Sequence, residues 1–209
     1  VPAERARSTH DGMGLMLGSR RLHFIDTAGH ARHHHCLWDE TTRGWFTGDT
    51  FGVSYREFDT PAQGACVLPI STPSQFEPDL LHASIVRLLA RQPACIYLTH
   101  FGRVDGAVDA GQRLLAWLDR LVALGRRHAD AADRHATLKR EMAALYTDIL
   151  TEHGITCTPA TLDLLAMDIE LNARFSKGAQ IQGGVSTGRT VNDRCFVVDS
   201  PQELYQCRV

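Results

Sequence analysis

Four histidines, at positions 30, 33, 34 and 35, stand close together in the stretch DTAGHARHHHC, which covers residues 26–36. Neutral imidazole is the commonest metal ligand among protein side chains, so a cluster of this kind raises the question of a metal site. A solvated surface cluster is the other common origin of a histidine run. The internal position, inside apolar sequence, argues against an expression tag.

Three apolar runs each end in a potential metal ligand: LHFIDTAGH ends at His30, GWFTGD at Asp49 and ACIYLTH at His100. A strand end gives a side chain rigid support and leaves it free to face a cleft, so ligands on several strand ends can converge. Gly29 and Gly48 stand beside two of them and permit tight turns. Two imidazoles and one carboxylate suit a divalent transition metal. Each signal alone has a commoner structural explanation, a satisfied histidine or an Asx turn.

The elements that must position these residues begin with short strands over residues 13–50: MGLMLG, LHFIDT, HCLWDE and GWFTGD. The stretch TTRG at 41–44 is typical of a hairpin connection between the last two. Residues 54–76 contain three prolines and show no sustained period. We therefore predict a long loop there, of the kind that often serves as a functional lid.

The hydrophobic period changes at residue 78, where leucine and isoleucine begin to recur at helical spacing. The spacing predicts a first helix from residue 78, a strand over 94–100, and helices over 106–127, 134–153 and 159–173. The fold class is therefore α/β. The remaining residues, 174–209, are rich in glycine, lack a helical period and are expected to form an atypical, disordered tail, with one strand at 195–198.

Composition limits the function. The chain has 209 residues, 44% hydrophobic and 22% charged, and a net charge of −2, as in a globular protein with a core. The absence of a basic cluster argues against nucleic acid as a partner. No apolar run approaches the roughly 18 residues of a membrane span, and the polar start is not typical of a signal peptide. Six cysteines without a C-x-x-C pair predict reduced thiols and a cytoplasmic location.

The stretches TAGH, FTGDT and YLTH, in this order, resemble the third, fourth and fifth metal motifs of the metallo-β-lactamase-fold hydrolases. This superfamily includes glyoxalase II-like thioesterases and lactonases, and the resemblance covers about residues 13–172. It implies that His30 is a ligand of a first metal, that Asp49 bridges two metals, and that His100 is a ligand of the second. His34 falls where members often carry a further histidine that is not itself a ligand, so the histidines at 33–35 are expected to support the site or to face elsewhere.

The sequence also departs from the pattern, because the motif H-x-H-x-D-H of this superfamily is absent from it. That motif supplies two histidines to the first metal and an Asp–His pair to the second. The resemblance therefore implies the C-terminal half of an αββα sandwich with an added helical segment, a partial domain over residues 1–173. Such a half would leave an apolar sheet face exposed, so we expect homo-oligomerisation or association with a partner through that face.

The resemblance implies a metal-dependent hydrolase that acts on an ester, thioester or lactone bond of a small-molecule substrate. Its cofactor would be Zn²⁺, one or two ions, with iron or manganese as alternatives, and Asp49 would be the catalytic residue. A non-catalytic metal-binding or interaction half-domain with a vestigial site is the alternative. A mononuclear iron site is a third reading, since His30, Asp49 and His100 match a 2-His-1-carboxylate set. Without the missing motif we expect little or no turnover.

Overall fold

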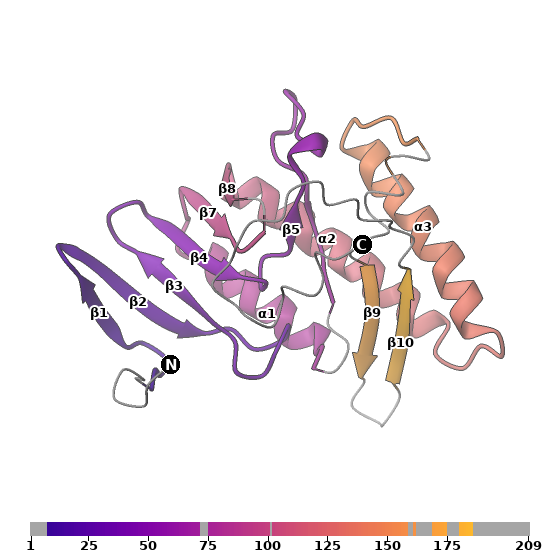
Figure 1. The fold of residues 1–209 in the computed structure, drawn as a ribbon, viewed down its shortest axis with the longest axis horizontal. Helices are drawn as coiled ribbons and strands as arrows, with labels where there is room; N and C mark the ends of the chain where they lie inside the picture. The colour runs from indigo at the N-terminus through magenta and orange to yellow at the C-terminus, as the bar shows by residue number, and fades with distance from the viewer. Residues whose placement is uncertain are drawn as a thin grey trace, which may run out of the picture.

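The computed structural model of the chain describes residues 8–71, 75–100, 102–158 and 161, and the backbone of 169–174 and 180–185. Its centre is a six-stranded mixed sheet (Figure 1). In spatial order the strands are β1 (Gly14–Leu17), β2 (Arg20–Asp26), β3 (His35–Asp39), β4 (Gly44–Gly48), β7 (Cys95–Leu98) and β8 (Gly102–Asp105). The strands predicted over 13–50, the hairpin at 41–44 and the strand at 94–100 are all confirmed.

The direction of the strands decides where the candidate ligands meet. Strands β1 to β4 form successive antiparallel pairs, whereas β7 lies parallel to β4. Strands β2, β4 and β7 therefore run in the same direction, and their carboxyl ends lie at one edge of the sheet. The residues that follow these three strands are brought to the same edge, although they are far apart in the sequence.

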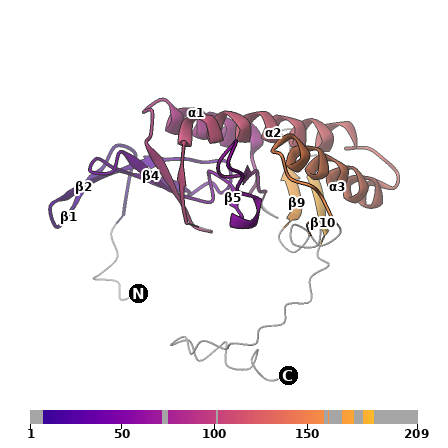
Figure 2. The same ribbon diagram turned by 90° about the horizontal axis from the view of Figure 1, so that it is seen from above.

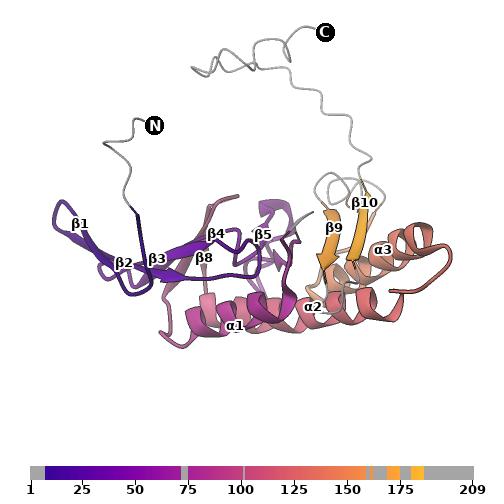
Figure 3. The ribbon, with the colours of Figure 1, turned by 90° about the horizontal axis from the view of Figure 1, so that it is seen from below.

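Among the described residues, three α-helices have the positions that the sequence predicts: α1 (Pro78–Leu89), α2 (Ala107–Arg127) and α3 (Arg134–Glu152). The three helices lie on one side of the molecule, with α1 and α2 packed against each other beneath the sheet (Figures 2 and 3). Each buries one apolar face; in α1 this face includes Leu81, Ile85 and Leu88. The Trp45 indole N–H donates to the Leu88 carbonyl at 3.0 Å, which ties β4 to α1. No described helix is long and apolar enough to cross a membrane.

The loop predicted over residues 54–76 contains more regular structure than its prolines indicate. Strands β5 (Val53–Ser54) and β6 (Val67–Leu68) pair as a small antiparallel sheet, and a 3₁₀ helix, η2, covers Arg56–Phe58. The prediction of an uninterrupted loop is therefore wrong. Burial stabilises this small sheet, because the side chains of Val67 and Leu68 are almost completely buried where β6 packs on α2.

The helix predicted over 159–173 is wrong at its C-terminal end. Ile169–Arg174 forms β9, which pairs antiparallel with β10 (Gln180–Val185), and β10 lies in turn beside α3 (Figure 1). Apolar Ile169, Leu171 and Ala173 alternate with polar residues, a period that suits a strand. The prediction of a disordered tail over 174–209 is likewise wrong for 180–185. The strand predicted at 195–198 lies outside the described residues.

The sheet face opposite the helices carries a row of apolar side chains. Leu37, Phe46 and Tyr97 lie side by side on neighbouring strands and point to this face, while Trp38 and Trp45 point to the buried one. The rings of Phe46 and Tyr97 stack with their centroids 4.6 Å apart, and Phe46 is 40% exposed. The molecule is thus an α/β layer with helices on one face of its sheet, which confirms the predicted fold class.

Candidate metal centre

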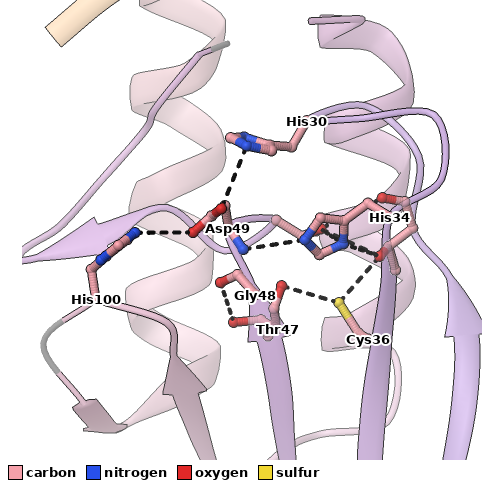
Figure 4. A network of polar contacts seen from close by, with 9 residues as sticks. His30, His34, Cys36, Thr47, Gly48, Asp49 and His100 are labelled. Atoms are coloured by element: carbon pink, nitrogen blue, oxygen red, sulfur yellow. Dashed lines mark hydrogen bonds and ion pairs between the residues drawn. The ribbon is translucent and has the colours of Figure 1, made fainter. Parts of the chain in front are cut away.

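The structure brings His30, Asp49 and His100 together at the edge where β2, β4 and β7 end (Figure 4). Asp49 directly follows β4 and lies between the two imidazoles. Its Oδ2 atom lies 3.6 Å from Nε2 of His30, and its Oδ1 atom lies 3.6 Å from Nε2 of His100. Each carboxylate oxygen therefore faces a different histidine.

The three side chains differ in exposure. His30 is 13% exposed, Asp49 30% and His100 57%, so the site opens to solvent on the His100 side. Burial lowers the pKa of His30, and the negative charge of Asp49 opposes this effect only in part. His30 is consequently neutral at neutral pH, which is the form of imidazole that binds a metal ion.

The loop that carries His30 is held against the first turn of α1. Gly29 has a φ of +133°, and a Cβ at this position would lie 2.2 Å from the backbone nitrogen of Leu81. The Glu77 backbone N–H donates to the Gly29 carbonyl at 2.8 Å. The sequence pattern predicts a glycine here for a tight turn, and the structure adds that the close approach to the helix also requires it.

The turn that carries Asp49 is equally restricted. Gly48 has a φ of +52°, and a Cβ there would lie 2.5 Å from Nε2 of His34. The His34 ring occupies the space where a side chain at residue 48 would lie. Its Nε2 accepts a hydrogen bond from the backbone N–H of Asp49 at 3.3 Å. Gly48 thus lets the His34 ring reach the backbone of the candidate ligand.

Behind Asp49 lies a buried polar network that the sequence patterns do not single out. Nδ1 of His34 lies 3.0 Å from Oγ1 of Thr50 and 3.2 Å from Oγ1 of Thr27. Oγ1 of Thr27 lies 3.2 Å from Sγ of Cys36, and the Cys36 thiol donates to the Thr47 carbonyl at 3.4 Å. The one visible signal is that a threonine follows an aspartate at two strand ends, in DT and GDT.

The four clustered histidines have different environments. His30 faces the Asp49 carboxylate, whereas His34 contacts the Asp49 backbone, and the two rings lie 6.0 Å apart between centroids. His35, on β3, packs against Phe24 with a centroid distance of 5.5 Å, and His33 is exposed. One histidine of the run therefore points at the carboxylate, and another supports it from behind.

The donor set fits a divalent cation in kind. Imidazole and carboxylate are the usual ligands of zinc and of non-haem iron, and Oδ1 of Asp49 is buried without receiving a hydrogen bond from any described residue. The number of protein ligands is smaller than a metal site usually has. Within the described ranges, no group of three or more His, Cys, Asp or Glu side chains forms a metal-binding cluster. Each oxygen of Asp49 has one imidazole opposite it, which gives two protein ligands for each cation position.

No protein-family model and no curated protein sequence matches the chain. Solved structures of metallo-β-lactamase superfamily proteins do match, and this is the superfamily that the motifs resemble. A β-lactamase domain protein from Burkholderia ambifaria has 20% identity over 86% of this chain and 53% of its own, with a TM-score of 0.47. A metallo-β-lactamase family protein from Thermus thermophilus has 19% identity over 78% and 50%, with a TM-score of 0.45.

An archaeal superfamily protein from Sulfolobus tokodaii is similar at 21% identity over 68% of this chain and 50% of its own, with a TM-score of 0.41. The chain thus spans about half the length of the solved structures that it matches. These likenesses concern the fold alone.

Proposed function

We propose that the chain carries part of the metal site of a hydrolase that acts on an ester, thioester or lactone bond. In this proposal His30 and Asp49 hold one divalent cation, Zn²⁺ in the first place, and His100 and Asp49 hold a second. The observation that carries the proposal is the placement of Asp49, with each carboxylate oxygen 3.6 Å from the Nε2 atom of a different histidine.

A divalent cation held there would act as a Lewis acid and would lower the pKa of water to about 7. The contribution of the chain itself is to hold ligands in a fixed arrangement on strand ends. Asp49 supplies the negative charge, His30 supplies a neutral imidazole, and the exposed side of His100 leaves room for a small-molecule substrate. Neither histidine has a place as a proton carrier in this arrangement, because both face the same carboxylate as candidate ligands.

A cavity of about 480 Å³ is a further place where a small molecule could bind, and none of the three candidate ligands lines it. Its lining includes Arg56, Asp59, Arg103 and Asp105, and β8, which carries the last two, begins shortly after His100. The volume lies within the range of ligand pockets. Because Arg56 pairs with Asp59 and Arg103 pairs with Asp105, the lining is close to neutral and favours polar recognition over capture of a strong anion.

Metal binding without catalysis is a second candidate function. The small number of metal ligands that the described residues supply favours this function. Catalytic zinc sites usually have three protein ligands, and the described residues supply two at each position. We therefore expect weak metal binding and little or no turnover. A panel of thioester and lactone substrates tests this expectation, and substantial turnover with one equivalent of metal would contradict it.

The metal assignment is tested by comparing Asp49→Asn with Asp130→Asn. Asn keeps the shape of the side chain and removes its charge, and Asp130 is an exposed aspartate between α2 and α3. Each protein is dialysed to equilibrium against buffer that contains Zn²⁺, and its bound metal is measured as the excess of zinc on the protein side of the membrane. We expect zinc in the wild type and in Asp130→Asn and its loss in Asp49→Asn. Equal zinc in all three would refute the ligand assignment.

A further inference from the structure

We propose that His34 is a positioning residue for Asp49, held as the neutral tautomer with its hydrogen on Nδ1, so that the bare Nε2 accepts the Asp49 backbone N–H. The importance of Asp49 as a ligand rests on the function proposed above. The hydrogen-bond arrangement itself rests on the geometry of buried side chains and stands independently of any metal.

The direction of the first hydrogen bond fixes the tautomer. A backbone N–H can only donate, so Nε2 of His34, 3.3 Å from the Asp49 nitrogen, must be the acceptor. In a neutral imidazole the hydrogen then resides on Nδ1. The nearest acceptor for that hydrogen is Oγ1 of Thr50 at 3.0 Å, followed by Oγ1 of Thr27 at 3.2 Å.

The remaining bonds continue in one direction. The Thr50 hydroxyl lies 3.3 Å from Oγ1 of Thr27 and donates to it, and the Thr27 hydroxyl can then donate to Sγ of Cys36 at 3.2 Å. The Cys36 thiol donates to the carbonyl of Thr47 at 3.4 Å. Thr47 lies on β4, two residues before Asp49, so the chain of hydrogen bonds starts and ends on the strand that carries the candidate ligand.

Burial makes this arrangement costly to change. Thr27, Cys36, Thr47 and Thr50 are each at most 1% exposed, so water has no access to replace a lost partner. A buried donor or acceptor left without a partner costs about 1–3 kcal/mol. If the hydrogen of the His34 ring moved to Nε2, two N–H groups would face each other at the Asp49 backbone, and if the ring flipped, a C–H group would face the Asp49 N–H and leave it without an acceptor. The network therefore fixes the ring, and the ring fixes the backbone of Asp49.

The consequence for the site is that Asp49 is set in place before any cation arrives. Partners that orient ligands from outside the coordination sphere commonly change metal affinity about 10–100-fold when removed. His34 meets this description, because it contacts the ligand's backbone and not its carboxylate. This contact requires glycine at position 48, because a Cβ there would lie 2.5 Å from Nε2 of His34.

The tautomer is tested on the full wild-type chain without metal. Long-range ¹H–¹⁵N NMR spectra of the histidine rings distinguish a protonated ring nitrogen from a bare one. We expect a protonated Nδ1 and a bare Nε2 for His34, and a hydrogen-bonded Asp49 amide that is protected from solvent exchange. A protonated Nε2, or an Asp49 amide that exchanges freely, would overturn the proposal without the need for any variant.

The positioning role is tested by His34→Gln, His34→Leu and, as a matched control, His33→Leu in the same loop. The Gln carboxamide reaches the place of Nε2 and offers an acceptor there, whereas Leu offers none. We expect Zn²⁺ affinity, measured by calorimetry, to fall about 10–100-fold in His34→Leu. It should be largely retained in His34→Gln and unchanged in His33→Leu. An equal fall in His34→Gln and His34→Leu, or no fall in either, would overturn the positioning role.

The two proposals fail in different ways. If the wild type binds no zinc, the proposed function is refuted, while the NMR tautomer and the Asp49 amide still decide the arrangement around His34. If the wild type and His34→Leu bind zinc equally well, the positioning role is refuted and the ligand assignment stands.

Discussion

Asp49 is held from two sides. Its backbone N–H is bound to His34, and its carboxylate oxygens lie opposite His30 and His100. The hydrogen bond to His34 restricts the backbone at Asp49, while Oδ1 of its carboxylate receives no hydrogen bond from any described residue. This arrangement is typical of a binding position that is organised before its ligand arrives.

Substitution of Gly48 tests the close contact behind Asp49. A left-handed backbone costs any L residue about 1–2 kcal/mol, and Gly18, with a φ of +60° and open space around it, measures this cost alone. At Gly48 an added Cβ would also lie 2.5 Å from a His34 ring that the buried network prevents from moving. We expect Gly48→Ala to lower the free energy of unfolding by more than Gly18→Ala in urea titrations. Equal losses would mean that the ring yields freely.

The buried cysteines provide a second prediction for single residues. Burial raises the pKa of Cys36 to about 11 and that of Cys66 to about 12, whereas Cys157 is partly exposed. Thiolate is the reactive form, so at pH 8 iodoacetamide should label Cys157 in the native chain and leave Cys36 and Cys66 unlabelled, as mapped by peptide mass spectrometry. Denaturation should make all three reactive. Native labelling of Cys36 would show that the polar network opens to solvent.

At the scale of elements, His153 joins α3 to the segment between β5 and β6. Its Nε2–H donates to the Gly64 carbonyl at 3.1 Å, and its ring lies 6.0 Å from that of Trp117 on α2. The residue is fully buried, and burial lowers its pKa below the usual value of 6.5, with the Gly64 hydrogen bond opposing in part. The folded chain therefore binds a proton at His153 less readily than the unfolded chain does.

This lowered pKa has a definite sign for stability. The contribution of neutral His153 is complete above pH 6.5, and it decreases as the pH falls from 6.5 through the lower pKa of the folded state. We expect His153→Gln to have a flatter dependence of unfolding free energy on pH between 7.5 and 5 than the wild type, in urea titrations. His33→Gln, at an exposed histidine, is the control. Parallel curves for the wild type and His153→Gln would contradict the assignment.

Most elements were predictable because their apolar residues repeat at the strand or helix period, as in α1, α2 and β2 to β4. Strand β8 was not, because Val104 is its only buried side chain and an edge strand with one anchor shows no alternation. The short β5–β6 pair was hidden by prolines, and its stability comes from packing on α2. Long-range burial of this kind leaves no local pattern.

The convergence of His30, Asp49 and His100 was predictable because each follows an apolar run, and strand ends of one direction share an edge. The support around them was not. Thr27, Thr50 and Cys36 meet through hydrogen bonds between side chains that are distant in the sequence, and common residue types carry no mark of such contacts. Which histidine of the run touches the Asp49 backbone likewise depends on the turn at Gly48.

At the scale of the molecule, we propose that the open sheet face binds a second copy of the chain. Phe46 and Tyr97 form a stacked pair beside Leu37 on the face away from the helices, and clusters of exposed apolar groups commonly mark interfaces. We expect Phe46→Ser to reduce concentration-dependent self-association in analytical ultracentrifugation. Leu80→Ser, at a similarly exposed leucine on α1 (44% against 40% exposed), is the control. An unchanged sedimentation profile for Phe46→Ser would contradict this prediction.

The crossover from β4 through α1 to β7 also dictates an order of events during folding. Strands β1 to β4 pair with their neighbours in the sequence, whereas β7 pairs with β4 across an intervening segment that contains β5, β6 and α1. Closing such a distant pair is the slow kind of step. We therefore expect the contact between His100 and Asp49 to form late in folding. An ion that prefers the finished site should slow unfolding more than it hastens folding.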